Sequence, residues 1–246
     1  MKVAIMQPYA FPYLGYFQLI HYVDKWVIFD DVQYISKGWV NRNRILHPDP
    51  SKEWQYFTIP VRKHTLDTRI KDVDINEDID WRSQLLGKLT SYKKKAPFYS
   101  ETIGLVKNCL SFKREALSEW VEYALVETCK HLGVNFDYSI YSKMDIEIQR
   151  VDHAGQWALE IADTMGASEY VNMPGGYEIF KEKEFKERGI DLRFIKPGLS
   201  AYQQNSHVFV PGLSIIDVLM WNDRQNILEM LADYKILSTN EIREYI

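Results

Sequence analysis

The chain begins with KVAIM at residues 2–6, QPYAFPYLGYF at residues 7–17 and WVIFDDVQ at residues 26–33. The first stretch is a short apolar run of the kind that is buried in a parallel sheet, and residues 15–23 carry apolar side chains at helical spacing. A second apolar run, residues 26–29, follows this helix. A strand, a helix and a strand in this order form a βαβ unit, which predicts a parallel sheet.

The rest of the chain continues the alternation of strands and helices, with one helical interruption. Apolar residues recur at helical spacing throughout residues 80–132, which predicts a helical insertion there. A chain of 246 residues can bury one full core. We therefore expect a single α/β domain over residues 1–246, built on a parallel Rossmann-like sheet. Further strands are expected at residues 56–61, 70–75, 135–140, 169–172 and 190–195, and further helices at 154–165, 178–188, 212–222 and 224–234.

The composition is that of a globular protein without a basic excess: 46% hydrophobic, 26% charged, with a net charge of −4. This balance gives no reason to expect a nucleic-acid partner. No run reaches the roughly 18 apolar residues that span a bilayer. The first residues do not resemble a signal peptide, so we expect a cytoplasmic protein without membrane insertion. Cys109, Cys129 and the 6 histidines show no metal-ligand spacing, so we expect neither a metal nor a cofactor.

The turn after the first strand is the first candidate site. The helix that follows would present free N–H groups and the positive end of its dipole to an anion held by the turn. The spacing resembles the first βα turn of class I nucleotidylyltransferases, where a His-x-Gly-His tetrad contacts phosphates; here it reads Tyr13-Leu14-Gly15-Tyr16. Phenols donate hydrogen bonds but carry no positive charge at neutral pH. The alternative is an aromatic-rich packing turn. The expected substrate-binding residues are Gln7, Tyr9, Tyr13, Gly15 and Tyr16.

Two carboxylates, Asp30 and Asp31, end the second strand, and Gln33 follows them. Adjacent residues at a strand end point in different directions, so we do not expect the pair to chelate one ion. One carboxylate can act as a general base or hold a substrate amine while the other caps local backbone. We expect Asp30 and Asp31 to be catalytic and Gln33 to bind substrate; the alternative is a turn and cap without chemistry.

A polar, basic segment follows, and it is a poor core sequence: Asn41, Arg42, Asn43 and Arg44. Guanidinium groups suit carboxylate or phosphate, and asparagine amides suit sugar hydroxyls. Arg42 and Arg44 would share a face if this segment is a strand. We expect all four residues to bind substrate; the alternative is a pair of structural salt bridges.

Two later segments complete the candidate residues. Gly175 and Gly176 follow a strand and allow close backbone approach to a ligand, although such loops are often simple connections. Tyr202 and Gln203 precede the closing helices. We expect these four residues to bind substrate.

The first closing helix carries a start signal of its own. Ser214 is a good N-cap residue, and Asp217 lies three positions later. This spacing favours a capping-box-like helix start. A nucleophilic role for Ser214 would need a basic partner, and the sequence places no histidine beside it.

These stretches together resemble the WbqC-like protein family, over most of the chain. The resemblance is carried by residues 7–17, 30–33 and 41–44 and by the late segment 202–217. The chain departs from the family at residues 172–176, where Asn-Met-Pro-Gly-Gly stands in place of a Ser-Gly-like loop. We therefore assign no role to a serine in that loop.

The resemblance implies a role in making bacterial surface polysaccharide, including the O-antigen of lipopolysaccharide. A transferase that moves an acyl or aminoacyl group to a nucleotide-linked amino sugar would fit, with an acyl or aminoacyl carrier protein supplying the thioester donor. The alternatives are a nucleotidylyltransferase-like enzyme that uses a nucleoside triphosphate and magnesium, and a non-catalytic scaffold that binds sugar or a partner.

Overall fold

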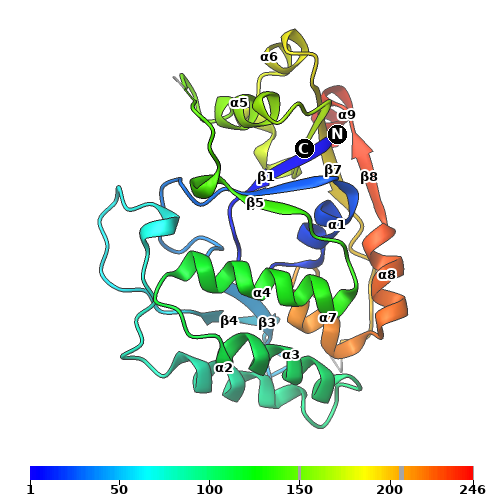
Figure 1. Cartoon of the computed structure of the whole chain (residues 1–246). Coiled ribbons are helices and arrows are strands. Elements are labelled where there is room, and N and C mark those ends of the chain that lie inside the picture. Colours follow the sequence, from blue (N-terminus) through cyan, green and yellow to red (C-terminus); the bar gives the residue numbers. More distant parts are fainter. Residues whose placement is uncertain (149–150, 205–207, 246) are drawn as a thin grey trace.

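The computed structural model describes residues 1–148, 151–204 and 208–245, and over these it shows a six-stranded sheet with helices on both faces (Figure 1). Neighbouring strands are parallel except at one edge, where β8 runs antiparallel to β7. The predicted parallel Rossmann-like α/β class is confirmed. In spatial order the strands are β5 (Tyr138–Ile140), β2 (Lys25–Ile28), β1 (Lys2–Met6), β6 (Glu169–Asn172), β7 (Asp191–Pro197) and β8 (Tyr234–Leu237).

Strand β1 lies in the interior of the sheet, between β2 and β6, and its apolar residues are buried on both faces. Ala4 belongs to the cluster on one face, and Val3 and Ile5 belong to the cluster on the other. From β1 the chain continues to β2 on one side of the sheet, and the later strands β6 and β7 are added on the other side of β1. In open α/β sheets, ligands bind outside the carboxyl ends of the strands at such a point.

Helices cover the two faces of the sheet in separate groups, which Figure 1 shows above and below the strands. One face packs against α5 (Gln156–Thr164), α6 (Glu182–Glu187) and α9 (Thr239–Tyr245). The other face packs against a larger group of helices, which includes those of the predicted insertion. All of them contribute to one cluster of buried residues. The helices of this group are α1 (Leu14–Tyr22), α2 (Trp81–Leu89), α3 (Tyr99–Ser111), α4 (Leu117–Leu132), α7 (Ile215–Trp221) and α8 (Arg224–Ala232).

Local chemistry explains where several helices begin and end. The Asp80 carboxylate caps α2 by accepting a hydrogen bond from the Ser83 N–H, and Asp223 caps α8 in the same way. Helix α4 ends at Gly133, whose φ of 71° lies in the left-handed region that glycine adopts without strain. No helix in the described part of the chain is long and apolar enough to span a membrane.

Two predicted elements differ from the structure. Residues 70–75 were expected as a strand, but they form the 3-10 helix η1 (Ile70–Asp72) and two isolated bridges. Their alternating burial arises because Ile70, Val73 and Ile75 point into the core beside α4. The strand expected at residues 56–61 is β4 (Trp54–Thr58), which pairs with β3 (Arg42–Leu46) in an antiparallel hairpin outside the main sheet.

The late part of the chain also departs from its expected boundaries. The helix expected at residues 178–188 is divided into the 3-10 helix η4 (Pro174–Ile179) and α6. Strand β8 begins at Tyr234, where the last predicted helix was expected to end.

Candidate functional site

Asp30 lies at the carboxyl end of β2, and its side chain joins this strand end to the end of β5. The residue is 3% exposed. Its carboxylate accepts a hydrogen bond of 3.0 Å from the Ser142 N–H and one of 2.5 Å from the Ser142 hydroxyl. Charge-assisted bonds of this length fix the carboxylate in place. The predicted candidate therefore lies at the sheet edge where α/β proteins bind ligands.

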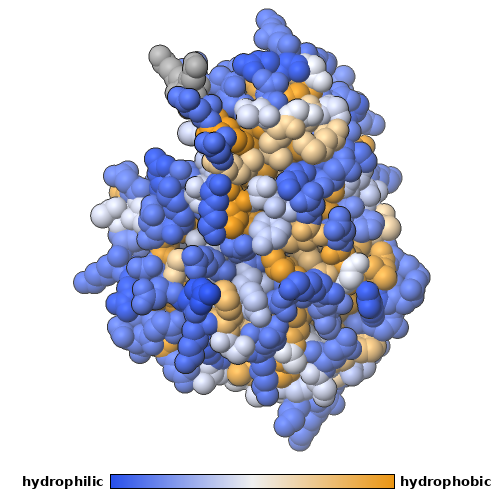
Figure 2. All heavy atoms as spheres, in the orientation of Figure 1, coloured by the Kyte–Doolittle hydropathy of each residue, from blue (hydrophilic) through white to orange (hydrophobic). Residues whose placement is uncertain are grey.

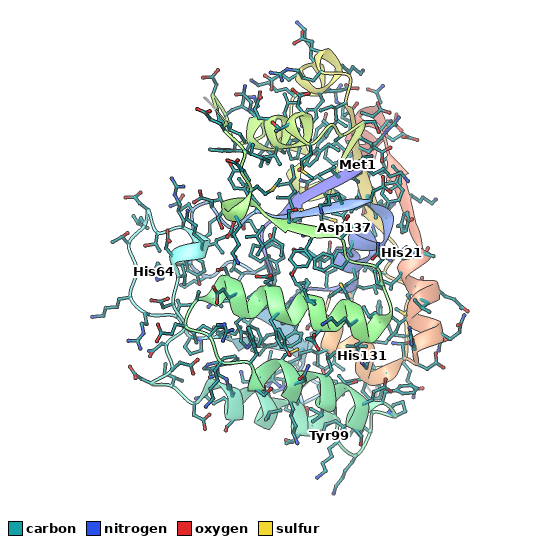
Figure 3. All side chains as sticks on the ribbon, viewed as in Figure 1. Met1, His21, His64, Tyr99, His131 and Asp137 are labelled. Atoms are coloured by element: carbon teal, nitrogen blue, oxygen red, sulfur yellow. The ribbon has the colours of Figure 1, made fainter. Side chains whose placement is uncertain are left out.

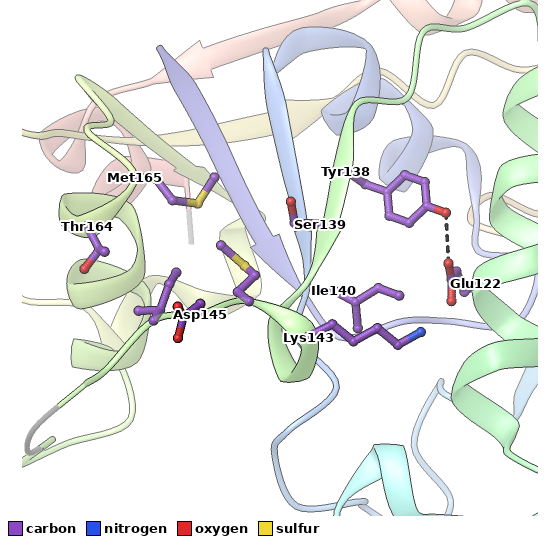
Figure 4. Close-up of a pocket in the computed structure, with 10 residues that line it drawn as sticks. Glu122, Tyr138, Ser139, Ile140, Lys143, Asp145, Thr164 and Met165 are labelled. Carbon is purple, nitrogen blue, oxygen red and sulfur yellow. Dashed lines mark hydrogen bonds between the residues drawn. The ribbon is translucent and has the colours of Figure 1, made fainter.

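A pocket of about 190 Å³ opens beside Asp30, between the strand ends and α4. It shares Glu122, Ile140 and Lys143 with a wider, open groove of about 820 Å³ along β5. Figure 4 shows Tyr138, Ile140 and Lys143 pointing toward α4, where Glu122 accepts a 2.8 Å hydrogen bond from the Tyr138 hydroxyl. Figure 2 shows apolar atoms gathered between α4 and α5 within a mostly hydrophilic surface. The region offers a ligand both polar and apolar contacts.

Asp31 takes different partners from Asp30. Its carboxylate lies 2.6 Å from Arg69 Nη1 and 3.0 Å from Lys71 Nζ. Burial alone would raise the pKa of Asp31, but the hydrogen bonds and positive charges of Arg69 and Lys71 outweigh it and hold the pKa below its usual range. Among the described residues, no group of three or more His, Cys, Asp or Glu side chains is arranged to hold a metal ion.

Arg42 and Arg44 lie on one face of β3, and aromatic rings surround both guanidinium groups. Arg42 lies 4.2 Å from the ring centre of Tyr56, which is the register partner of Arg44 on β4. Arg44 lies 5.2 Å from the ring centre of Trp54 and 5.4 Å from that of Trp39. We call these five residues the arginine–aromatic face. Within the described part of the chain, neither arginine pairs with a carboxylate; their hydrogen bonds go to the carbonyls of residues 37, 38 and 212.

The two asparagines of this segment face inward. Asn43 donates a 2.9 Å hydrogen bond to the Phe11 carbonyl, and its oxygen accepts from the Arg44 N–H at 2.8 Å. Asn41 donates to the Ile59 carbonyl at 2.8 Å. Both side chains are buried. Asn43 therefore ties β3 to the turn after β1, and Asn41 ties it to the residue that follows β4.

The turn after β1 is packed more closely than the sequence suggested. Tyr16 is fully buried, and its hydroxyl donates to the Gln7 carbonyl at 2.9 Å. The Tyr9 ring packs beside it at an angle of 40°, with ring centres 5.6 Å apart. A Cβ on Gly15 would lie 2.5 Å from the Tyr13 ring, so this glycine makes room for Tyr13. Of the residues expected to form an anion cradle, Tyr16 and Gly15 are enclosed by protein, and Gln7, Tyr9 and Tyr13 are half-buried.

The remaining predicted residues are separated from one another. Gln33 is exposed and donates to the Leu66 carbonyl at 2.7 Å. Gly175 is exposed within η4. A Cβ added to Gly176 would lie 3.0 Å from the Asn172 side-chain oxygen, so this glycine packs closely against Asn172. Tyr202 donates a 2.7 Å hydrogen bond to Asp217, whereas Gln203 is exposed. Its neighbour Gln204 is buried and makes the inward contact.

Asp217 is the centre of a buried polar cluster that the sequence did not reveal. It is fully buried, yet its carboxylate accepts 2.7 Å hydrogen bonds from the hydroxyls of Tyr92 and Tyr202 and a 2.9 Å bond from Gln204. Ser214 does cap α7, by accepting from the Ile216 N–H. Asp217 does not complete a capping box, because the Ser214 N–H donates to the Arg44 carbonyl. A carboxylate within the apolar sequence IIDVLM was the available signal.

The fold is that of a Rossmann-like α/β protein with a pocket at the carboxyl edge of its sheet. Residues 7–229 match the WbqC-like protein family, and the chain belongs to this family. It is 31% identical over 221 residues to Uncharacterized protein Rv1507c of Mycobacterium tuberculosis, across 89% of this chain and 92% of that protein. No solved structure matches the chain.

Proposed function

We propose that this protein is a transferase that acts on a nucleotide-linked amino sugar and moves an acyl or aminoacyl group onto its amine. The donor would be a thioester on a carrier protein. The resemblance to the family implies the setting, the synthesis of bacterial surface polysaccharide such as O-antigen.

The observation that carries the proposal is the arginine–aromatic face. Two cations lie side by side on β3, and neither is neutralised by a carboxylate of the described residues. Guanidinium groups bind phosphate with paired hydrogen bonds, and flat rings suit a base or the apolar face of a sugar. Trp39 remains 38% exposed at the edge of this face. A nucleoside diphosphate sugar supplies both kinds of group.

The charge of the strand-end pocket supports an amine as the acceptor. Its lining carries the carboxyl groups of Asp30, Asp72, Glu119 and Glu122 against two lysines. Lys71 also lies 3.0 Å from Asp31, and Glu119 lies 3.3 Å from Arg114, so one charge of each sign is partly offset and the remaining carboxylates outnumber the remaining lysine. A negative pocket attracts an ammonium group. Asp30 would take the proton that converts this ammonium group to a free amine, or orient the amine for attack.

A nucleotidylyltransferase reaction receives less support. That chemistry would use the side chains of the βα turn to contact triphosphate. Tyr16 is instead buried in the core, and the ring of Tyr13 covers Gly15 at the start of α1.

Replacing Arg42 with alanine should weaken binding of a nucleotide-linked amino sugar by about tenfold to a hundredfold, because a hydrogen bond to a charged group contributes about 1.5–3 kcal/mol. Arg44→Ala should have an effect of the same order. Isothermal titration of the purified variants measures both.

Arg193→Ala is the matched control, since Arg193 lies on β7 and pairs with Asp191. This variant should bind with wild-type affinity. If the wild type, Arg42→Ala and Arg44→Ala bind the nucleotide-linked amino sugar with equal affinity, the arginine–aromatic face is not part of the binding site.

A further inference from the structure

A serine and a histidine meet on two surface loops outside the strand-end pocket. The Ser36 hydroxyl lies 3.0 Å from His64 Nε2, although the two residues are 28 positions apart. The other ring nitrogen, Nδ1, lies 3.1 Å from the Arg62 carbonyl oxygen. Figure 3 labels His64 at the side of the molecule, in the loop that follows β4.

These contacts set the roles of the two ring nitrogens. A carbonyl oxygen only accepts hydrogen bonds, so the hydrogen of a neutral imidazole must lie on Nδ1. Nε2 is then an acceptor, and the Ser36 hydroxyl donates to it. A hydroxyl that donates to a base, with the base oriented by a third group, is the arrangement of an activated nucleophile.

Both side chains are exposed, and their surroundings fix the backbone turn at Ser36 and support the His64 ring. The Gly38 N–H donates to the Ile35 carbonyl at 3.0 Å, which closes a tight turn around Ser36, and Lys37 has a left-handed φ of 63°. The ring of Tyr34 meets the His64 imidazole at 89° with centres 5.0 Å apart. Tyr34 is itself buried, so one edge of the imidazole packs against a residue of the core.

Arg42 places a positive charge beside the same turn. Its Nε donates to the Gly38 carbonyl at 3.1 Å, and its Nη2 donates to the carbonyl of Lys37. A fixed cation near a nucleophile can stabilise the oxyanion that forms when a carbonyl is attacked. Ser36 also lies in the chain between Asp30 and Arg42, the two parts of the proposed site.

We propose that Ser36 carries the acyl group as a covalent intermediate and that His64 is its general base. Ser36 Oγ attacks the thioester carbonyl while His64 Nε2 takes the hydroxyl proton. The C–S bond then breaks, and His64 gives this proton to the leaving thiolate. In the second half-reaction an amine, or water in its absence, attacks the Ser36 ester and transfers a proton to His64; the C–O bond breaks and the proton returns to Ser36 Oγ.

This inference rests on the proposed function for the identities of the thioester donor and the amine acceptor, but the first half-reaction needs no nucleotide sugar. We would therefore incubate the full chain with para-nitrophenyl acetate, and separately with acetyl-coenzyme A, and follow the intact mass. The wild type should gain one acetyl group, and peptide mapping should place it on Ser36. Ser36→Ala should lose it, and His64→Gln should slow its formation by roughly 10²–10⁴-fold.

Ser51→Ala and His21→Gln are the controls, since both replaced residues are exposed and neither touches this pair. Both variants should react as the wild type does. No adduct on the wild type, an equal adduct on Ser36→Ala, or an unchanged rate in His64→Gln would overturn the inference. An adduct on Ser36 without nucleotide-sugar binding would overturn the proposed function alone, and binding without an adduct would overturn this inference alone.

Discussion

Replacing Asp217 with alanine should lower the free energy of unfolding by about 2–4 kcal/mol. The change leaves the hydroxyls of Tyr92 and Tyr202 and the amide of Gln204 without their acceptor in a buried place, and each hydrogen bond to a charged group contributes about 1.5–3 kcal/mol. Removing the buried charge also removes its desolvation penalty, which offsets part of this loss of stability. The carboxylate holds the segment before α7 to the Tyr92 hydroxyl, which also accepts from the Leu46 N–H at 2.9 Å. Urea unfolding measures the difference.

The same residue predicts a pH dependence. Burial raises the pKa of Asp217, although its hydrogen bonds act in the opposite direction. The folded state therefore holds this proton more tightly than the unfolded state, so the contribution to stability is fully present below the unfolded pKa and is lost as pH rises through the folded pKa. Asp217→Asn should remove this dependence. Asp223→Ala is a control that should cost about 1 kcal/mol, as loss of a helix cap does. If Asp217→Ala costs no more than this control, the buried cluster does not stabilise the fold.

Replacing Trp120 with alanine should cost about 3–5 kcal/mol of unfolding free energy. Trp120 of α4 is fully buried, and its ring centre lies 5.3 Å from that of Trp81 and 5.7 Å from that of Phe11. Its indole N–H donates to the Cys109 carbonyl at 3.1 Å. Phe11 has a left-handed φ of 43°, which is strained for an aromatic residue and needs support from its neighbours.

The effect of Trp120→Ala should reach the proposed site, because Phe11 also receives hydrogen bonds from Asn43 and Ser214. We expect weaker nucleotide-sugar binding as well as lower stability. Trp120→Phe keeps most of the ring contact and should lose less of both. Chemical unfolding and ligand titration of the two variants measure this. Full stability in Trp120→Ala would show that the helices of residues 80–132 do not support the turn after β1.

The sequence predicted the parts of the fold that depend on local pattern. The buried run before Gln7, the helix after it and the second apolar run were enough for a βαβ unit. The helix expected at residues 154–165 is α5, and Gly166, with a φ of 69°, lies just after its end. Residues 70–75 were misread because alternating burial arises both in a strand and in an irregular segment that crosses a core edge.

The candidate site was predicted less completely, for a physical reason. Residues at strand ends, such as Asp30 and Arg42, carry a signal in their immediate sequence. Contacts between residues of distant loops leave no such local signal. Ser36 and His64 are 28 positions apart, and only the fold of the chain brings them together. The same limit applies to Gln203 and Gln204, since one step along an irregular segment decides which side chain is buried.

The most direct test of the central claim is a thermal-shift screen of the purified protein. The ligands are a nucleoside diphosphate-linked amino sugar, the same nucleotide sugar without the amine, and nucleoside triphosphates with magnesium. A ligand at 100 times its dissociation constant stabilises the folded state by about 2.7 kcal/mol, which gives a clear shift. We predict the largest shift with the amino sugar. A shift with triphosphates and magnesium alone, or no shift with any nucleotide sugar, would contradict the account.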